Sequence, residues 1–255
     1  MKRSLWLGAG SLLLALLVLL VLLAVAPAVQ AEPRRSGFED MSPALRAMQQ
    51  DDAQNPAFLW LQAGGQRFRQ DCARCHTTDS LRGVATRYPA FDTVLGQPVT
   101  LSARINLCQT RHVGSAASPP ESEALLGLEA FVARQSRGLL IAKPTDPRLA
   151  SFVAQGERLY RLRMGQLDLS CAQCHDEQAG RRLGGSIIPQ GHPTGYPIYR
   201  LEWQGLGSLQ RRLRHCMSGV RAEPFAFGSA EFTALELYLM QRAAGLPLET
   251  PAVRP

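Results

Sequence analysis

The order of apolar and polar positions along the chain predicts a mostly helical protein. Apolar residues recur at helical spacing in several stretches, and loops rich in Pro and Gly separate them. The predicted helices cover residues 43–68, 101–107, 121–135, 149–164 and 229–243, and a further one leads up to Cys216. A strand pattern is confined to residues 198–203.

The pattern of the first half recurs in the second half. Residues 101–108 and 209–216 share the form Leu-x-x-Arg-x-x-x-Cys, and the helical stretches 128–132 and 235–239 match each other further along. A repeat of this size indicates an internal duplication. The cysteines that end the two copies, Cys108 and Cys216, therefore hold corresponding places.

The N-terminus has the form of an export signal. A positive start, Met1-Lys2-Arg3, precedes an apolar run over residues 5–26, and Val29-Gln30-Ala31 fits a cleavage site. We therefore predict a signal peptide over residues 1–31 and a periplasmic location. The apolar run is also long enough to span a bilayer, so an uncleaved leader would act as a membrane anchor.

Net charge and basic composition favour anionic partners. The formal net charge is +7, and all but two of the 28 basic residues are arginines. Guanidinium groups bind oxyanions through two parallel donors. No basic cluster is interleaved with aromatic residues, so we expect no nucleic-acid binding.

Two Cys-x-x-Cys-His motifs predict the cofactor. They are Cys72-Ala-Arg-Cys75-His76 and Cys171-Ala-Gln-Cys174-His175. In this motif the two thiols attach a c-type haem covalently, and the adjacent His ligates the iron. A zinc site would combine the cysteine pairs, whereas here each pair has its own His. We predict two covalently bound haems.

The predicted fold class is mainly α, with two tandem cytochrome c-like haem domains related by internal duplication. The expected division places an N-terminal extension at residues 32–62, of which 32–42 read as a linker. The first haem domain covers 63–143 and the second, catalytic domain covers 144–255, with a linker at 143–147.

The remaining cysteines, Cys108 and Cys216, are the predicted distal iron ligands. A disulfide between them is the alternative in an oxidising compartment. Only cysteine occupies the corresponding slot of both halves, which favours ligation. The competing side chains are His112 in the first half, and His192, His215, Met217 and Met240 in the second.

Basic residues around Cys216 indicate sulfur chemistry. A thiolate ligand lowers the haem potential, and neighbouring positive charge stabilises the nucleophilic thiolate. Arg212 lies four residues before Cys216, on the same helix face. It would hold a sulfur oxyanion there, although a haem propionate or Glu236 is an alternative partner. Arg221 is the next candidate.

The second half resembles SoxA, the catalytic cytochrome subunit of SoxAX complexes in thiosulfate oxidation. The resemblance rests on residues 165–176, 190–204, 207–216 and 234–239, and it extends over the chain from Gly64. It implies an L-cysteine S-thiosulfotransferase that couples thiosulfate oxidatively to a cysteine of the carrier SoxYZ, with a SoxX-type monohaem cytochrome as partner. By this resemblance, Cys216 is a haem-ligating persulfide and Arg212 binds substrate.

Two other functions stay open from the residues alone. In a pure electron-transfer dihaem cytochrome, Cys216 would be a ligand and no more. In a haem-based sensor, one distal ligand would be missing or easily displaced.

Overall fold

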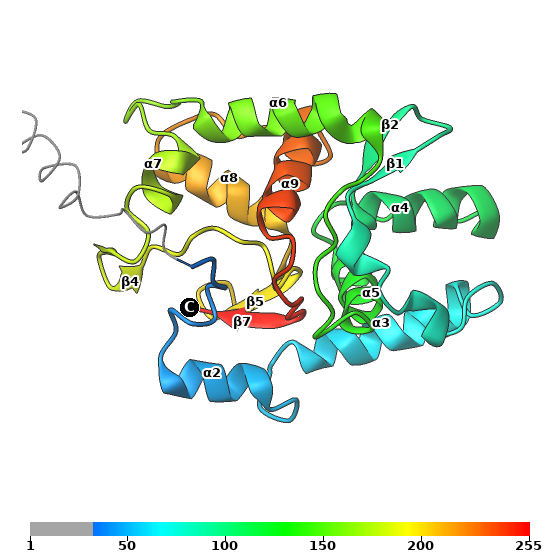
Figure 1. Ribbon diagram of the computed structural model, residues 1–255. Helices are drawn as coiled ribbons and strands as arrows, with labels where there is room; N and C mark the ends of the chain where they lie inside the picture. The colour runs from blue at the N-terminus through cyan, green and yellow to red at the C-terminus, as the bar shows by residue number, and fades with distance from the viewer. Residues whose placement is uncertain (1–32) are drawn as a thin grey trace, which may run out of the picture. The chain divides into compact units, whose positions relative to one another are not determined.

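The computed structural model describes residues 33–255, so the predicted leader lies outside the described residues. Residues 34–255 form one compact unit. Figure 1 shows the α-helices of residues 58–134 gathered on one side of this unit and those of residues 150–242 on the other. None of the described helices is long and apolar enough to cross a membrane.

A crossed helix pair forms the core of the first half. α3 (Phe58–Asp71) packs against α5 (Glu123–Arg134). The two backbones meet at Gly64, where a Cβ atom would lie 1.9 Å from the carbonyl oxygen of Gly127. Phe68 and Phe131 stack below the crossing with ring centroids 5.2 Å apart. Only glycine permits so close an approach.

The second half repeats this crossing. α6 (Ala150–Arg161) packs against α9 (Ala230–Arg242), and a Cβ atom on Gly156 would lie 2.1 Å from the carbonyl oxygen of Ala234. Tyr160 and Tyr238 form the aromatic pair, with ring centroids 5.4 Å apart. In each half the Cys-x-x-Cys-His motif follows the first helix of the crossed pair along the chain.

Each half also contains a short hairpin that leads into a helix. In the first half β1 (Ala90–Asp92) and β2 (Gln97–Val99) precede α4 (Leu101–Cys108). In the second half β5 (Ile198–Arg200) and β6 (Gly205–Gly207) precede α8 (Leu209–Gly219). The hydroxyl groups of Thr100 and Ser208 cap the two helices, as is typical of helix N-termini.

The C-terminus and the N-terminal segment close the second half together. β7 (Ala252–Arg254) pairs in parallel with β5, which gives the strand order β6-β5-β7. α2 (Pro43–Gln50) lies against β7, and the Gln49 side chain accepts a hydrogen bond from the backbone of Val253. These contacts fix the sheet edge, and Figure 1 shows α2 below β7.

The remaining elements are short. They are η1 (Asp79–Leu81), η2 (Ala85–Arg87), the π-helix η3 (Gln109–Val113), η4 (Pro147–Leu149), α7 (Cys171–His175), β3 (Arg182–Leu183) and β4 (Ser186–Ile187).

The predicted helices are confirmed, with small differences at their ends. The 43–68 stretch is two helices, because residues 51–57 form turns. The strand at 198–203 is confirmed as β5, but the sequence did not reveal the other short strands. The predicted linker 32–42 is not a free tether: from Arg34 onward it is docked, with Arg34 donating to the carbonyl oxygens of Arg242 and Ala244.

Candidate functional site

The second Cys-x-x-Cys-His motif is held in a defined shape. Its five residues form α7, whose start carries a capping box between Ser170 and Gln173. His175 receives its orientation from the loop that follows, since its Nδ1 lies 2.7 Å from the carbonyl oxygen of Pro189. Gly191 has φ of +73° and packs against the ring, where a Cβ atom would come within 3.1 Å of Cγ. The ring therefore keeps Nε2 for iron, as iron-ligating histidines require.

Cys216 faces this motif from α8. Its thiol lies close enough to His175 for that side chain to lower the pKa of the thiol. Burial raises the pKa of the Cys171 thiol to about 11, and the proximity of Cys216 adds to this rise. The pKa of Cys174 is raised by the same two causes. The four side chains that the sequence assigned to the second haem therefore lie together.

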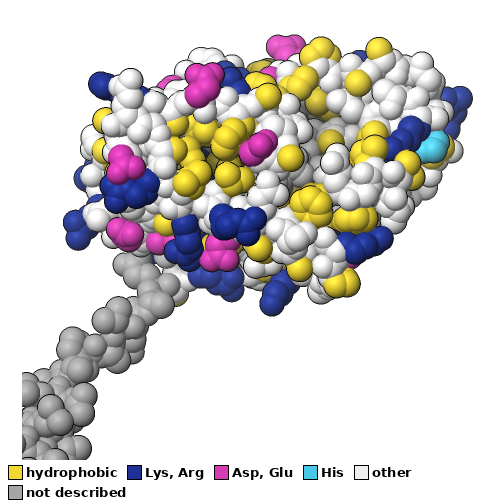
Figure 2. All heavy atoms as spheres, turned by 90° about the horizontal axis from the view of Figure 1, so that it is seen from above, with side chains coloured by type: hydrophobic (Ala, Val, Ile, Leu, Met, Phe, Trp, Pro, Cys, Tyr) yellow, Lys and Arg dark blue, Asp and Glu magenta, His cyan; other side chains and the backbone are white. Residues whose placement is uncertain are grey.

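A cavity of about 550 Å³ opens between these groups. That volume lies within the range of cofactor pockets, about 300 to 1,000 Å³. Its walls combine the predicted ligands with apolar side chains and several arginines, among them Cys171, His175, Cys216, Leu209, Leu213, Leu235, Leu239, Arg200, Arg212 and Arg254. Seen from above, apolar side chains gather around a hollow on this half of the molecule (Figure 2).

The chemistry of these walls fits a haem group. Cys171, His175 and Cys216 line this cavity, and they would supply an attachment thiol, a proximal ligand and a distal ligand to a bound haem. Three buried polar atoms in the walls have no partner among the described residues: Oδ2 of Asp40, Nδ1 of His192 and Nε of Arg200. The apolar body and carboxylate groups of a haem match such a lining.

Positive charge surrounds Cys216 inside the cavity. Arg212 makes no hydrogen bond or ion pair through its side chain within the described part of the chain, and it lines the cavity together with Cys216. Burial by itself would raise the pKa of the Cys216 thiol. The His175 side chain and the charges of Arg212 and Arg200 outweigh that effect, so the pKa of Cys216 lies below its usual value.

The first motif has a more open setting. Cys72 directly follows α3 and is half-buried, whereas Cys75 and His76 are exposed. Burial raises the pKa of the Cys72 thiol, to which the charges of Asp71 and Cys108 also contribute. The cysteine that ends α4 thus lies beside the first motif. No disulfide joins any of the six cysteines in the structure, and Cys108 and Cys216 are not paired with each other.

The matching arginine of the first half has a different environment. Arg104 donates to Asp92 with Nη2 2.7 Å from Oδ2, and Arg111 binds the same carboxylate at 3.4 Å. Asp92 is 3% exposed. The backbone N–H of Leu95 and the Arg104 guanidinium hold the pKa of Asp92 below its usual range. Arg104 is therefore a neutralised structural cation.

The competing ligand candidates lie elsewhere, with one exception. His112 and His215 are exposed, and Met217 is buried in the core of the second half. Met240 packs against the core of the first half. His192 does line the cavity, and burial together with the charges of Arg242 and Arg34 lowers its pKa to about 4. His192 is therefore a neutral wall residue.

Arg221 does not join the site in this structure. Its backbone has φ of +58°, and its guanidinium donates to the side chain of Gln166 at 3.4 Å. Glu236, the alternative partner of Arg212, accepts a hydrogen bond from Gln210. No ion pair joins Glu236 to Arg212 among the described residues.

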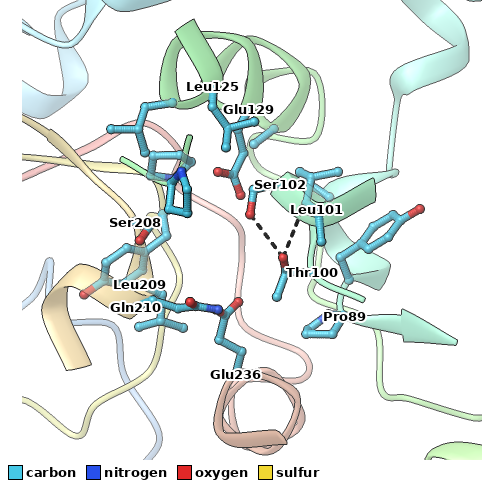
Figure 3. A pocket seen from close by; sticks show the side chains of 18 of the residues that line it. Pro89, Thr100, Leu101, Ser102, Leu125, Glu129, Ser208, Leu209, Gln210 and Glu236 are labelled. Atoms are coloured by element: carbon cyan, nitrogen blue, oxygen red, sulfur yellow. Dashed lines mark hydrogen bonds between the residues drawn. The ribbon is translucent and has the colours of Figure 1, made fainter. Parts of the chain in front are cut away.

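A second, smaller cavity of about 180 Å³ lies where the two halves meet. Figure 3 shows Glu129 entering it from α5, with Glu236 and Gln210 on the opposite wall. Burial raises the pKa of Glu129 to about 8 and that of Glu236 to about 7, and neighbouring carboxylates add to both. Oε2 of Glu129 has no hydrogen-bond partner within residues 33–255.

Comparison with known proteins matches this arrangement. The family model described as the SoxA/TsdA cytochrome c domain matches residues 57–141 and 155–248. The chain belongs to this family of cytochromes c. It is 31% identical to the L-cysteine S-thiosulfotransferase subunit SoxA of Paracoccus pantotrophus, over 86% of this chain and 78% of that protein.

Other SoxA proteins are similar to this chain at comparable levels of identity. The SoxA subunit of Rhodovulum sulfidophilum is 32% identical over 86% of this chain and 80% of its own length. The crystal structure of SoxXA from P. pantotrophus contains a chain with 31% identity and a TM-score of 0.84, with 87% of each chain covered. As a SoxA-family cytochrome c, the chain carries covalently bound haem, and its two motifs provide for two such groups.

Sequence reasoning missed two residues of the cavity wall, Arg200 and Tyr196. Burial raises the pKa of Tyr196 to about 12, and its hydroxyl lies close enough to Arg212 and Cys216 to be affected by their charges. Both residues belong to the segment that matches Tyr88-Pro-Ala-Phe-Asp92 of the first half. That match was the available signal.

Proposed function

We propose that this chain is a SoxA-type L-cysteine S-thiosulfotransferase subunit. It couples thiosulfate oxidatively to a cysteine of a SoxYZ-type carrier protein in the periplasm, after its leader has been cleaved. It works as a heterodimer with a SoxX-type monohaem cytochrome. The names of its relatives and the SoxXA complex support this assignment.

The observation that carries the proposal is the pairing of Cys216 with an arginine that has no protein anion. Cys216 and Arg212 line one cavity with the second haem motif. In the first half the corresponding Arg104 is neutralised by Asp92. A cation left free beside a reactive sulfur atom is suited to an anionic sulfur substrate.

The reaction balances with one proton and two electrons released. Thiosulfate and a carrier thiol give a carrier Cys–S–S–SO₃⁻ group: one S–S bond forms and the thiol S–H bond breaks. Thiosulfate is first joined, with loss of two electrons, to the outer sulfur atom of a persulfide on Cys216. The carrier thiolate then attacks the attached thiosulfate and displaces the Cys216 persulfide. Arg212 holds the sulfonate end during both steps. The haem groups of this chain and of the partner cytochrome would accept the two electrons one at a time.

We assign the haem ligands by pairing each motif with the cysteine beside it. Cys171 and Cys174 attach the second haem, and His175 and Cys216 ligate its iron. In the first half Cys72 and Cys75 attach the haem, with His76 and Cys108 as ligands. The matching helix crossings and hairpins support two duplicated haem domains, residues 63–143 and 144–255, although the chain folds as one unit after residue 33.

Mass spectrometry of the tryptic peptide that contains Cys216 tests the catalytic role. The active holoprotein should carry one additional sulfur atom on Cys216, and cyanide should remove it together with thiosulfate-dependent turnover. The peptide that contains Cys108 is the matched control and should be unmodified. An inert, unmodified Cys216 in an active preparation would instead support the pure electron-transfer cytochrome.

A further inference from the structure

The two hairpins place opposite charges at one matching position. Asp92 is the last residue of β1, and Arg200 is the last residue of β5. Each pairs in register with the first residue of the following strand, Gln97 or Gly205. Asp92 precedes Arg104 by twelve residues, and Arg200 precedes Arg212 by the same number.

In the first half this position completes an ion pair. Asp92 accepts from both Arg104 and Arg111, and its two nearest backbone donors are Val94 and Leu95. The carboxylate is buried and fully engaged. No cation of this cluster is left over for a ligand.

In the second half the position that corresponds to Asp92 holds Arg200, a cation instead of an anion. Arg200 lines the cavity of Cys216 and Arg212, and its side chain is 14% exposed. Burial and the charge of Arg212 lower the pKa of Arg200. The two guanidinium groups therefore lie close enough to repel each other.

Arg200 is only partly compensated by the protein. Its Nη2 binds Glu202 at 2.8 Å, and its plane lies over Trp203 with Cζ 5.1 Å from the ring centroid. Its Nε is buried without a hydrogen-bond partner among the described residues. Leaving a buried charged donor unsatisfied is costly unless a ligand fills the place.

We propose that Arg200 forms an oxyanion clamp with Arg212 and that it binds the sulfonate group of thiosulfate beside Cys216. The inference rests on the proposed function and deepens it. Two adjacent guanidinium groups suit a dianion, because a second negative charge offsets their repulsion. Attachment to the central strand of the β6-β5-β7 sheet holds Arg200 in place.

A haem propionate is also an oxyanion that Arg200 could bind in place of the sulfonate of thiosulfate. Different measurements distinguish these two ligands. Loss of a sulfonate contact raises the KM and the Kd for thiosulfate. Loss of a propionate contact changes the haem absorption spectrum and the pH dependence of its reduction potential, with thiosulfate binding unchanged.

The test compares variants of the full-length holoprotein in its complex with the partner cytochrome. Arg200→Gln should raise the KM for thiosulfate, and the calorimetric Kd measured without carrier, by about 10- to 100-fold. Arg200→Asp should have a larger effect, because it recreates the ion pair that neutralises Arg104. Arg200→Lys should restore part of the affinity.

Arg211→Gln is the matched control. Arg211 also stacks on Trp203, with Cζ 4.3 Å from the ring centroid, but it donates to the Leu206 carbonyl group and does not line the cavity. Its variant should bind thiosulfate within about a factor of three of the parent. The haem spectra of all variants should match the parent.

Two results would overturn the inference. If the Arg200 variants keep the parent KM and Kd, Arg200 does not bind thiosulfate, and a concurrent change in haem spectrum or potential would assign it to a propionate. If the parent itself neither binds nor turns over thiosulfate, the proposed function has failed and the clamp with it. Should Arg200→Gln not fold, the Arg200→Lys and Arg211→Gln measurements decide in the same way.

Discussion

The two halves of this chain share a framework but use it differently. Both cross two helices at a glycine, and both place an arginine four residues before a cysteine that lies beside a Cys-x-x-Cys-His motif. In the first half Asp92 neutralises the arginine, and the proximal His76 is exposed. In the second half Arg200 replaces the carboxylate, and a cavity forms around Cys216.

This difference shows how one framework serves two purposes. A change of charge at one strand end leaves the hairpin, the helix cap and the cysteine position intact. It converts an internal ion pair into a site with surplus positive charge. The ion pair neutralises Arg104, whereas in the proposed function the positive charge of Arg212 and Arg200 binds an anion.

The largest expected effect separates the two cysteines. Cys216→Ala should lower thiosulfate-dependent turnover by about a thousandfold or more, because the sulfur that accepts thiosulfate is lost. Cys108→Ala should keep turnover within a few fold of the parent, at about the level of a modest structural perturbation. Steady-state assays with carrier protein and haem spectra of both variants provide the check. A reversed result would exchange the roles of the two halves.

The next effect compares the two arginines. Arg212→Gln should raise the KM for thiosulfate by about 10- to 100-fold, since a charge-assisted contact is lost. Arg104→Gln should leave KM unchanged but lower the midpoint of thermal unfolding, because Asp92 loses its nearest cation. Kinetics and thermal melts of both variants test the contrast. An unchanged KM for Arg212→Gln would remove the distinction between the halves.

The buried glutamates predict a pH dependence of stability. The folded-state pKa of Glu129 is about 8, above its value of 4.5 in model peptides. The stability that this carboxyl group contributes is present below pH 4.5 and is lost as the pH rises to 8. The loss is about 1.4 kcal/mol per pH unit in that window. Glu129→Gln should remove this slope in denaturant unfolding.

Glu236 gives the matched comparison from the second half. Its pKa is about 7, and Gln210 donates a hydrogen bond that opposes the rise. Its contribution should therefore be lost over a narrower window, from pH 4.5 to 7. Urea unfolding of the parent, Glu129→Gln and Glu236→Gln across this pH range measures the pH window that each carboxyl group affects. If the two substitutions change stability over the same pH window, the difference between the two environments is contradicted.

The smallest effect concerns the cap of the second motif. Ser170→Ala removes the capping box of α7 and should destabilise the protein by about 1 kcal/mol. Ser170→Thr keeps the hydroxyl group and should cost less. The first motif directly follows α3 and has no such cap in the structure. Denaturant unfolding of both variants measures the effect, and identical losses would show that the hydroxyl is not what stabilises α7.

Local patterns in the sequence predicted most of the helices and the placement of the cysteines. Helical periodicity located α4, α5 and α9, and the repeated Leu-x-x-Arg-x-x-x-Cys pattern correctly placed Cys108 and Cys216 beside their motifs. The short strands were missed because two or three residues carry too little periodicity to be recognised. The docking of the segment after Arg34 was missed because it depends on backbone carbonyl groups of α9.

By itself, the sequence determined the chemistry available to this protein: two haem-attachment motifs, two further cysteines and an arginine one helical turn before each. Those features depend on residue identity and short spacing, which a sequence states directly. Only the tertiary structure decided which arginine is free. Asp92 and Arg200 reach Arg104 and Arg212 through hairpins that reverse the chain, so the charge around each cysteine depends on contacts between residues distant in sequence.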